Sequence, residues 1–215
     1  MTAPRIRAYE PKDRETIRRI ACETALYGNP IDPLINDRDL VADYLVRYYT
    51  DFEPESLFVA EVEGKVVGYL TGCLNSEKCR QIVQRRILPP LLVRFFIHGH
   101  WFQGKILRML LAIWRSERRW VSARWAACAP YPAHCHLNLD PEFRRAGTGS
   151  GLLEAFLAQL RQHRVPGIHI ITATEQGKNF FVRAGFTLLM QYDSASLPGA
   201  SARETWVMGK KLEAA

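Results

Sequence analysis

A glycine-rich stretch in the C-terminal half of the chain has the clearest potential for chemistry. Arg145-Ala-Gly-Thr-Gly-Ser-Gly151 follows a segment with strand character, His134–Leu139, and precedes an amphipathic helical pattern. A helix that begins there would aim its free N–H groups and the positive end of its dipole at one point. Glycine at positions 147 and 149 would let an anion approach the backbone. The stretch therefore predicts an anion site, most naturally for a pyrophosphate.

Two standard phosphate motifs do not fit this stretch. A dinucleotide fingerprint needs G-x-G-x-x-G, whereas Gly147, Gly149 and Gly151 are spaced G-x-G-x-G, with Leu152 at the third glycine position. A P-loop needs Lys and then Ser or Thr at its end, and the stretch contains no Lys. Both motifs are therefore excluded.

The pattern that does fit is R-x-x-G-x-G, filled by Arg144, Gly147 and Gly149. A second segment, Phe180-Phe-Val-Arg-Ala-Gly-Phe186, matches F-Y-x-x-x-G-F except at its second position. Together they resemble the coenzyme A motif and the fourth helix and following strand of the GNAT family of N-acetyltransferases. The resemblance implies an α/β (α+β) fold in which a mixed, mostly antiparallel sheet of about seven strands is flanked by helices. A helical insertion would lie between the third and fourth strands.

The same resemblance implies which co-substrate and acceptor the protein uses and which residues hold the coenzyme. Acetyl-CoA would be the co-substrate, no metal would be needed, and the acetyl group would pass directly to a primary amine of a small molecule or peptide in a ternary complex. In such enzymes two neighbouring parallel strands separate beside the coenzyme, and an exposed backbone N–H stabilises the oxyanion. The residues assigned to the coenzyme in this way are Leu137, Asn138, Leu139, Arg144, Arg145, Ala146, Gly147, Thr148, Gly149, Ser150, Gly151, Asn179 and Phe181.

Phe181 departs from the family pattern, which commonly has a tyrosine there as the acid that protonates the leaving thiolate. A phenyl ring has no proton to donate, so Tyr131, Tyr192 or a water serves, or the thiolate leaves unassisted, as a thiol pKa of ~8.5 permits. Thr174 stands where the family often has an asparagine that contacts the coenzyme, and Asn179 is the alternative for that contact.

The general base has three candidates: His136, Glu175 and His134. The two histidines share one strand face, and imidazole has a suitable pKa for accepting a proton from an amine. Packed core histidines, and a helix-terminal acid favoured by the dipole, are the structural alternatives to these roles. Cys135 as an acyl-carrying nucleophile lacks an activating partner. His134, Cys135 and His136 do not form a zinc site, because adjacent strand residues point to opposite faces.

The elements that must position these residues follow in a consistent order. Before the insertion we expect a strand at Arg5–Tyr9, a helix after Asp13, a helix after Asn36 or Asp37, and a hairpin whose strands meet at Glu63-Gly64. After it we expect a strand at His134–Leu139, a helix at Leu152–His163, a strand at Ile168–Thr174, a helix at Glu175–Arg183, and strands at Phe186–Tyr192 and Glu204–Lys210.

Charge divides the chain unevenly. The whole chain carries a formal charge of +7, but residues 75–125 contain eleven Lys or Arg and only two Glu, so the remainder is slightly acidic. We expect short helices in this insertion, about residues 75–130, at Glu77–Leu88, Leu91–Ile97 and Gln103–Arg119. Cations interleaved with aromatics could serve nucleic acid or a membrane surface. The preferred interpretation is helices that cover the acceptor pocket, with their cations in water.

Composition sets the broad class. With 215 residues and 47% apolar side chains, one acetyltransferase domain over residues 1–215 is expected, and general disorder is excluded. Five cysteines without a CxxC pair indicate reduced thiols in the cytoplasm. No run approaches the ~20 apolar residues of a membrane span. Nucleic acid is not favoured as a partner, and a homodimer stays open.

A second hypothesis is a catalytically inactive acyl-CoA-binding module. Residues 132–143 are also similar to the acetyltransferase-like domains attached to some O-GlcNAc hydrolases, a group that includes members without activity. Phe181 and the lack of a carboxylate on the strand that begins near His134 favour this hypothesis.

Overall fold

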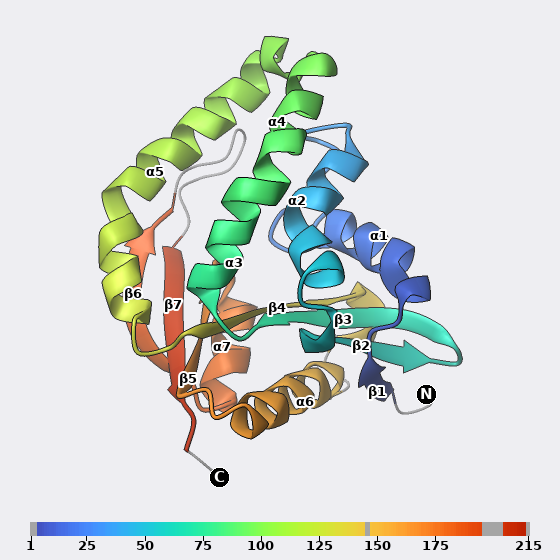
Figure 1. Cartoon of the computed structure of the whole chain (residues 1–215), viewed down its shortest axis with the longest axis vertical. Helices are drawn as coiled ribbons and strands as arrows, with labels where there is room; N and C mark the ends of the chain where they lie inside the picture. Colours follow the sequence, from blue (N-terminus) through green and yellow to red (C-terminus); the bar gives the residue numbers. More distant parts are fainter. Residues whose placement is uncertain (1–3, 145–146, 195–203, 214–215) are drawn as a thin grey trace.

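A seven-stranded sheet forms the centre of the protein in the computed structural model, which describes residues 4–144, 147–194 and 204–213 (Figure 1). Its strands lie in the order β1-β2-β3-β4-β5-β7-β6, and only β4 and β5 are parallel neighbours. This confirms the mixed, mostly antiparallel sheet. The strands are β1 (Arg5–Ala8), β2 (Leu57–Val62), β3 (Lys65–Cys73), β4 (Ala133–Leu139), β5 (Gly167–Thr172), β6 (Thr187–Asp193) and β7 (Glu204–Lys211).

Helices cover both faces of the sheet. On one face, α1 (Arg14–Thr24) and α2 (Arg38–Asp51) bury side chains such as Ile17 and Val46 against β2 and β3. On the other face, α6 (Thr148–Gln162) and α7 (Glu175–Arg183) pack apolar residues such as Phe156 against the sheet. The central strand β4 is therefore flanked by two different layers.

Local capping and turn chemistry explain several of these boundaries. The Asp37 side chain accepts the Leu40 N–H at 3.0 Å and caps α2, and the Thr174 hydroxyl accepts the Gly177 N–H at 3.2 Å and caps α7. Between β2 and β3, Gly64 has φ +77°, a backbone conformation that glycine adopts without steric cost. The predicted hairpin is confirmed.

The insertion between β3 and β4 is helical, as predicted. It comprises α3 (Ser76–Ile82), a π-helical turn at Val83–Ile87, α4 (Leu88–Ile97), a 3₁₀ turn at His100–Phe102 and α5 (Gly104–Cys128). We call residues 88–128 the arm. Figure 1 shows α4 and α5 meeting far from the two chain ends. The end of α5 returns to the sheet, where Cys128 packs near Tyr192 and Val207.

Three predicted helix boundaries were wrong. The helix α6 begins at Thr148, four residues before the predicted Leu152, because Gly147 supplies the left-handed cap and the next glycines continue the helix. The helix α5 continues to Cys128, past the predicted Arg119. The helix α4 begins at Leu88, three residues before the predicted Leu91, because prolines 89 and 90 fit its first turn.

All five cysteines are buried free thiols, in agreement with the predicted reduced state. Among the described residues, no helix combines the length and the apolar character that a membrane crossing requires.

Candidate active site

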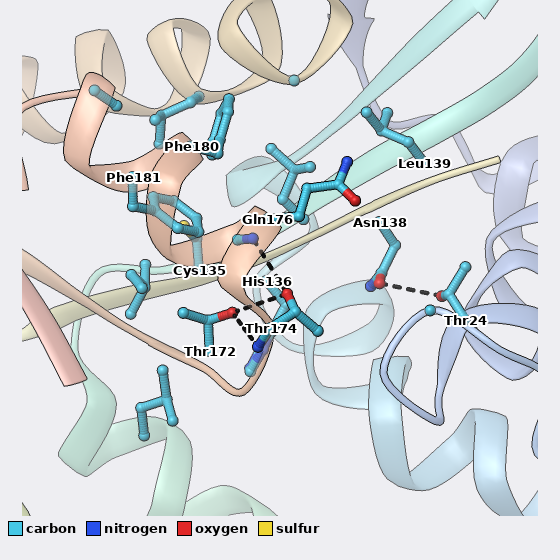
Figure 2. Close-up of a pocket in the computed structure, with 18 of the residues that line it drawn as sticks. Thr24, Cys135, His136, Asn138, Leu139, Thr172, Thr174, Gln176, Phe180 and Phe181 are labelled. Atoms are coloured by element: carbon cyan, nitrogen blue, oxygen red, sulfur yellow. Dashed lines mark hydrogen bonds between the residues drawn. The ribbon is translucent and has the colours of Figure 1, made fainter. Parts of the chain in front are cut away.

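A cleft opens where β4 and β5 separate. These parallel strands are paired only at Ala133 with Ile168 and at His134 with His169. Beyond these pairs the strands diverge, and a cleft of about 900 Å³ lies between β4, β5, α7 and the start of α6 (Figure 2). The separation of two parallel strands, predicted from the family resemblance, is thus present.

Backbone groups of β4 face this cleft. The Asp140 N–H donates to the Val67 carbonyl of β3 at 2.9 Å, and the register pairs Leu139 with Gly68. Because backbone groups alternate sides along a strand, the N–H and C=O groups of Leu139 and Leu137 point away from β3. They therefore point toward the gap that β5 leaves open.

The N-terminus of α6 lies at the same cleft. Gly147 has φ +78° and opens the helix, and the Gly151 N–H already donates to the Gly147 carbonyl at 3.1 Å. The N–H groups of the first turn precede any helical acceptor, so they are available to a ligand. Gly147 and Gly149 line the cleft, as does the Arg144 side chain. This donor set fits a phosphate group.

The predicted coenzyme residues fall into three groups. Gly151 packs on β1, where a Cβ would lie 3.1 Å from Ile6, and Thr148 is buried at the helix start. Arg145 and Ala146 lie outside the described residues. Asn179, exposed on α7, does not line the cleft. The predicted coenzyme residues that do line it are Leu137, Asn138, Leu139, Arg144, Gly147, Gly149, Ser150 and Phe181, and the candidate base His136 lines it too.

The Asn138 side chain is already engaged by the protein. Its amide nitrogen donates to the Tyr69 hydroxyl at 3.0 Å, and its amide oxygen lies 3.1 Å from the Thr24 hydroxyl. Figure 2 shows this contact crossing from β4 to the end of α1. Asn138 therefore joins the strand to α1, and its side chain shapes the wall of the cleft.

His134 is held on both ring nitrogens. Its Nε2 lies 2.8 Å from the Tyr49 hydroxyl and its Nδ1 lies 2.7 Å from the Ser76 hydroxyl, which also donates to the Pro132 carbonyl. Burial keeps the pKa of His134 well below its ordinary value. His134 does not line the cleft, so its geometry suits a packed histidine and disfavours the role of base.

His136, two residues along the same strand face, is exposed to the cleft. Its ring packs against the Tyr49 ring at 5.9 Å, and it makes no hydrogen bond to any residue that the structure describes. Desolvation by the surrounding protein, with a smaller repulsion from His169, lowers the pKa of His136 to about 4. Its imidazole is therefore neutral at pH 7 and free to accept a proton.

The other candidate groups are less well placed. Glu175 is exposed at the start of α7 and does not line the cleft. Cys135 lines it, but burial raises the pKa of its thiol to about 12, which opposes a nucleophilic thiolate. Phe181 lines the cleft among aromatic neighbours, whereas neither Tyr131 nor Tyr192 reaches it.

Sequence reasoning missed part of the cleft wall. Thr24, Tyr27 and Gly28 come from the end of α1 and the loop after it, and Thr172 is the last residue of β5. Thr174, which stands where the family often has an asparagine, also lines the cleft, as the cap of α7. Gly28 follows the end of α1. Its φ of +93° and the turn around it bring Tyr27 to the cleft, a long-range placement that no local pattern encodes.

Comparisons with known proteins agree with this geometry. The protein is similar over 98% of its length to the crystal structure of SsHAT, with 24% identity, 98% of that chain covered and a TM-score of 0.73. It is similar to the phosphinothricin acetyltransferase of Sinorhizobium meliloti in complex with AcCoA (16% identity, 98% and 89% covered, TM-score 0.60). It is also similar to a Drosophila melanogaster polyamine N-acetyltransferase, with 16% identity, 97% of this chain and 100% of that chain covered, and a TM-score of 0.58.

These structures share the fold, and the model of one family matches the sequence itself. Residues 29–186, which include β4, the glycine-rich loop, α6 and α7, match the model of the acetyltransferase (GNAT) family. The matched range contains most residues of the cleft between β4 and β5. The chain therefore belongs to the acetyltransferase (GNAT) family.

Proposed function

We propose that this protein is an acetyl-CoA-dependent N-acetyltransferase that moves an acetyl group to a primary amine by direct attack in a ternary complex. One observation carries the proposal: β4 and β5 separate directly beside the N-terminus of α6. The gap offers backbone groups to a pantetheine arm, and the helix offers N–H donors to a pyrophosphate. Acetyl-CoA, when bound, supplies a thioester that an amine can attack.

Backbone donors on β4 support the acyl-transfer step. The Leu137 N–H points toward the gap, so it can donate to a thioester oxygen there and stabilise the negative charge that develops on attack. Phe180 and Phe181 form an apolar wall on the opposite side of the cleft. An apolar wall excludes water, which strengthens such a hydrogen bond.

Proton removal is assigned to His136. It faces the cleft and lies on the sheet face covered by α1 and α2. Its lowered pKa keeps it neutral at neutral pH and also makes it a weak base, so its position in the cleft carries the assignment. A neutral imidazole can take a proton from the attacking amine, either directly or through a water. Glu175 and His134 are weaker candidates for this role, because neither side chain lines the cleft.

Thiolate departure proceeds without a side-chain acid from α7. Phe181 cannot donate a proton, and neither Tyr131 nor Tyr192 lines the cleft. A thiol with a pKa of ~8.5 is a tolerable leaving group in water, so solvent can protonate it. Catalysis then rests on positioning the two reactants and on the oxyanion donor.

The acceptor is a primary amine on a small molecule or peptide. It would enter from the side of the cleft where Thr24 and Tyr27 lie. We further propose that residues 1–215 act as one acetyltransferase domain in the cytoplasm, on the strength of the one continuous sheet and the five free thiols.

The test pairs turnover with binding. Release of free thiol from acetyl-CoA is measured across a panel of amines, and calorimetry measures the binding of CoA to the same protein. Turnover with any amine supports the enzyme. Binding without turnover on every amine favours the inactive acyl-CoA-binding module, which the phenylalanine at position 181 already favours. A protein that binds no CoA would refute both.

A further inference from the structure

The arm carries an unusual number of apolar side chains in contact with solvent. On α4, exposure is 54% for Leu92, 59% for Val93 and 76% for Ile97. The exposed large apolar residues of the arm are Leu92, Val93, Phe96, Ile97, Trp101, Phe102, Leu107, Leu110, Leu111, Ile113, Trp114 and Trp125. An apolar surface of this extent marks an interaction site more often than a free surface.

Helical spacing organises these residues. On α5, Leu107, Leu110, Leu111 and Trp114 recur every three or four residues, so they form one stripe along the helix. A second stripe on α4 ends at Phe96 and Ile97. The two helices meet at the His100–Phe102 turn, where the rings of Trp101 and Phe102 stack with centroids 3.5 Å apart. The end of the arm is therefore an apolar, aromatic tip.

Cations surround this apolar surface. Within the described part of the chain, none of the exposed basic residues Lys105, Arg108, Arg115, Arg118 and Arg119 of the arm, nor Arg85 and Arg86 just before it, is in an ion pair. Arg118 lies over the Trp114 ring at 4.9 Å, which places a cation directly beside an apolar side chain. The arm thus presents positive charge and exposed hydrocarbon together.

Charge complementarity decides among the occupants that such a surface could take. A second copy in a two-fold pair would place a positively charged patch on both sides of the interface, because both partners use the same patch. A nucleic acid would pair with the cations, but it would leave aliphatic side chains such as Leu92, Val93 and Ile97 in water. An anionic bilayer surface pairs with the cations and also takes the aliphatic and aromatic side chains.

We propose that the arm docks the enzyme onto the surface of anionic membranes. The tip residues enter the boundary between headgroups and acyl chains, and the arginines of α5 contact the headgroups. No part of this docking crosses the bilayer. It would bring the acetyltransferase cleft near amines presented at a membrane surface, whatever the acceptor is.

The experiment is flotation of the full-length protein with vesicles of phosphatidylcholine alone or of phosphatidylcholine with 30% phosphatidylserine, a composition of ~30% being enough to give a clear negative surface potential. We expect the bound fraction to be at least tenfold higher on the anionic vesicles at low salt, and to fall steeply as salt screens the headgroups. Brominated lipids should quench the tryptophan emission, with Trp101 nearest the bilayer.

Two sets of variants separate the contributions. The tip variant Phe96→Ser/Ile97→Ser/Phe102→Ser and the charge variant Arg108→Gln/Arg115→Gln/Arg118→Gln alter only exposed side chains, so they should fold normally. Each should lower binding to the anionic vesicles about tenfold or more, since each headgroup contact contributes severalfold.

The matched control for the tip is Leu188→Ser. The control for the charges is Arg5→Gln/Lys65→Gln/Lys211→Gln, on the exposed sheet ends. Neither control should change binding.

Three results would overturn the proposal. One is equal binding to neutral and anionic vesicles, or binding to neither. Another is a protein that sediments as a dimer and becomes a monomer in the tip variant while vesicles stay unbound, because a second copy would then occupy the arm. The third is binding of a 30-nucleotide single strand that outcompetes the anionic vesicles and depends on the arginines alone.

Discussion

The cleft and the arm use opposite means to meet a ligand. The cleft between β4 and β5 offers fixed backbone groups, held by the sheet on one side and by the start of α6 on the other. The arm offers long, exposed side chains on two helices that meet far from the sheet. The first arrangement suits one ligand of defined shape, whereas the second suits a broad surface. The positive charge of the chain is concentrated in residues 75–125, which include most of the arm, and says little about the coenzyme site.

The largest expected effect contrasts two helix-opening glycines. At Gly149 a Cβ would make ordinary contacts, 3.4 Å from Phe180 and 3.6 Å from Leu137, and Gly149→Asp would place a carboxylate at the proposed phosphate site. CoA affinity should fall about 1000-fold, because an anion then faces an anion and loses its donors. The control Gly104→Asp, where a Cβ meets nothing within 4 Å at the start of α5, should bind CoA normally. Calorimetry measures both, and a change of less than threefold for Gly149→Asp would contradict the assignment.

The second effect concerns rate. His136→Gln should lower kcat about 100-fold with CoA affinity unchanged, because it removes the proton acceptor and leaves the backbone donors in place. Because the pKa of His136 is lowered to about 4, the base is neutral above that pH. The acid limb of the pH profile should therefore lie near pH 4. The exposed His163→Gln serves as the control, and an unaltered rate for His136→Gln would move the role to another group.

The third effect concerns attachment of the arm. Asp37 accepts hydrogen bonds from Arg94, at 2.7 Å, and from His98 and His100, so it ties the arm to the start of α2. Burial alone would raise the pKa of Asp37, but hydrogen bonds from the Leu40 N–H, His100 and Arg94 outweigh it and lower the pKa to about 2.

A carboxylate with a lowered folded-state pKa stabilises the fold above its unfolded value of ~3.9, and that contribution is lost as the pH falls toward 2. Asp37→Asn should therefore reduce the free energy of unfolding by about 2 kcal/mol at pH 7, and the difference from wild type should shrink between pH 4 and pH 2. Urea titrations at pH 7, pH 4 and pH 2 measure the difference in unfolding free energy between Asp37→Asn and wild type. A difference that does not depend on pH would mean that the charge of Asp37 plays no part.

The smallest effect compares two isoleucines of the arm. Ile106 is 2% exposed and packs in the cluster that includes Ile31 and Leu34, whereas Ile97 is 76% exposed. Ile106→Val should cost about 1 kcal/mol of unfolding free energy, and Ile97→Val should change it by less than about 0.5 kcal/mol. Thermal unfolding checks both. A comparable loss at Ile97 would show that the tip is buried in solution.

The sequence predicted the elements with strong local signals. Thr174 and Gly185 bracket α7, and its bounds were predicted correctly, because a cap hydroxyl and a left-handed glycine are local features. At α6 the glycine content suggested a loop, yet the helix begins at Thr148, because burial against the sheet outweighs the low helix propensity of glycine.

The candidate site could be predicted only in part. The motif around Arg144 indicated the cleft, but strand periodicity put His134 and His136 on the same face without distinguishing their surroundings. Tyr49 and Ser76, which hold His134, come from α2 and α3 and are distant in sequence. The exposure of the arm also depends on what packs against it, which a helical pattern does not state.

The hydrogen bonds around His134 have a direction. The Pro132 carbonyl can only accept, so the Ser76 hydroxyl donates to it and must accept from Nδ1 of His134, which leaves Nε2 to accept from Tyr49. One proton arrangement satisfies all three contacts, and the chain ends at a carbonyl that cannot pass a proton on. The polar groups around His134 thus form a dead end for protons, and the proposed base His136, which hydrogen-bonds to none of them, would return its proton to solvent.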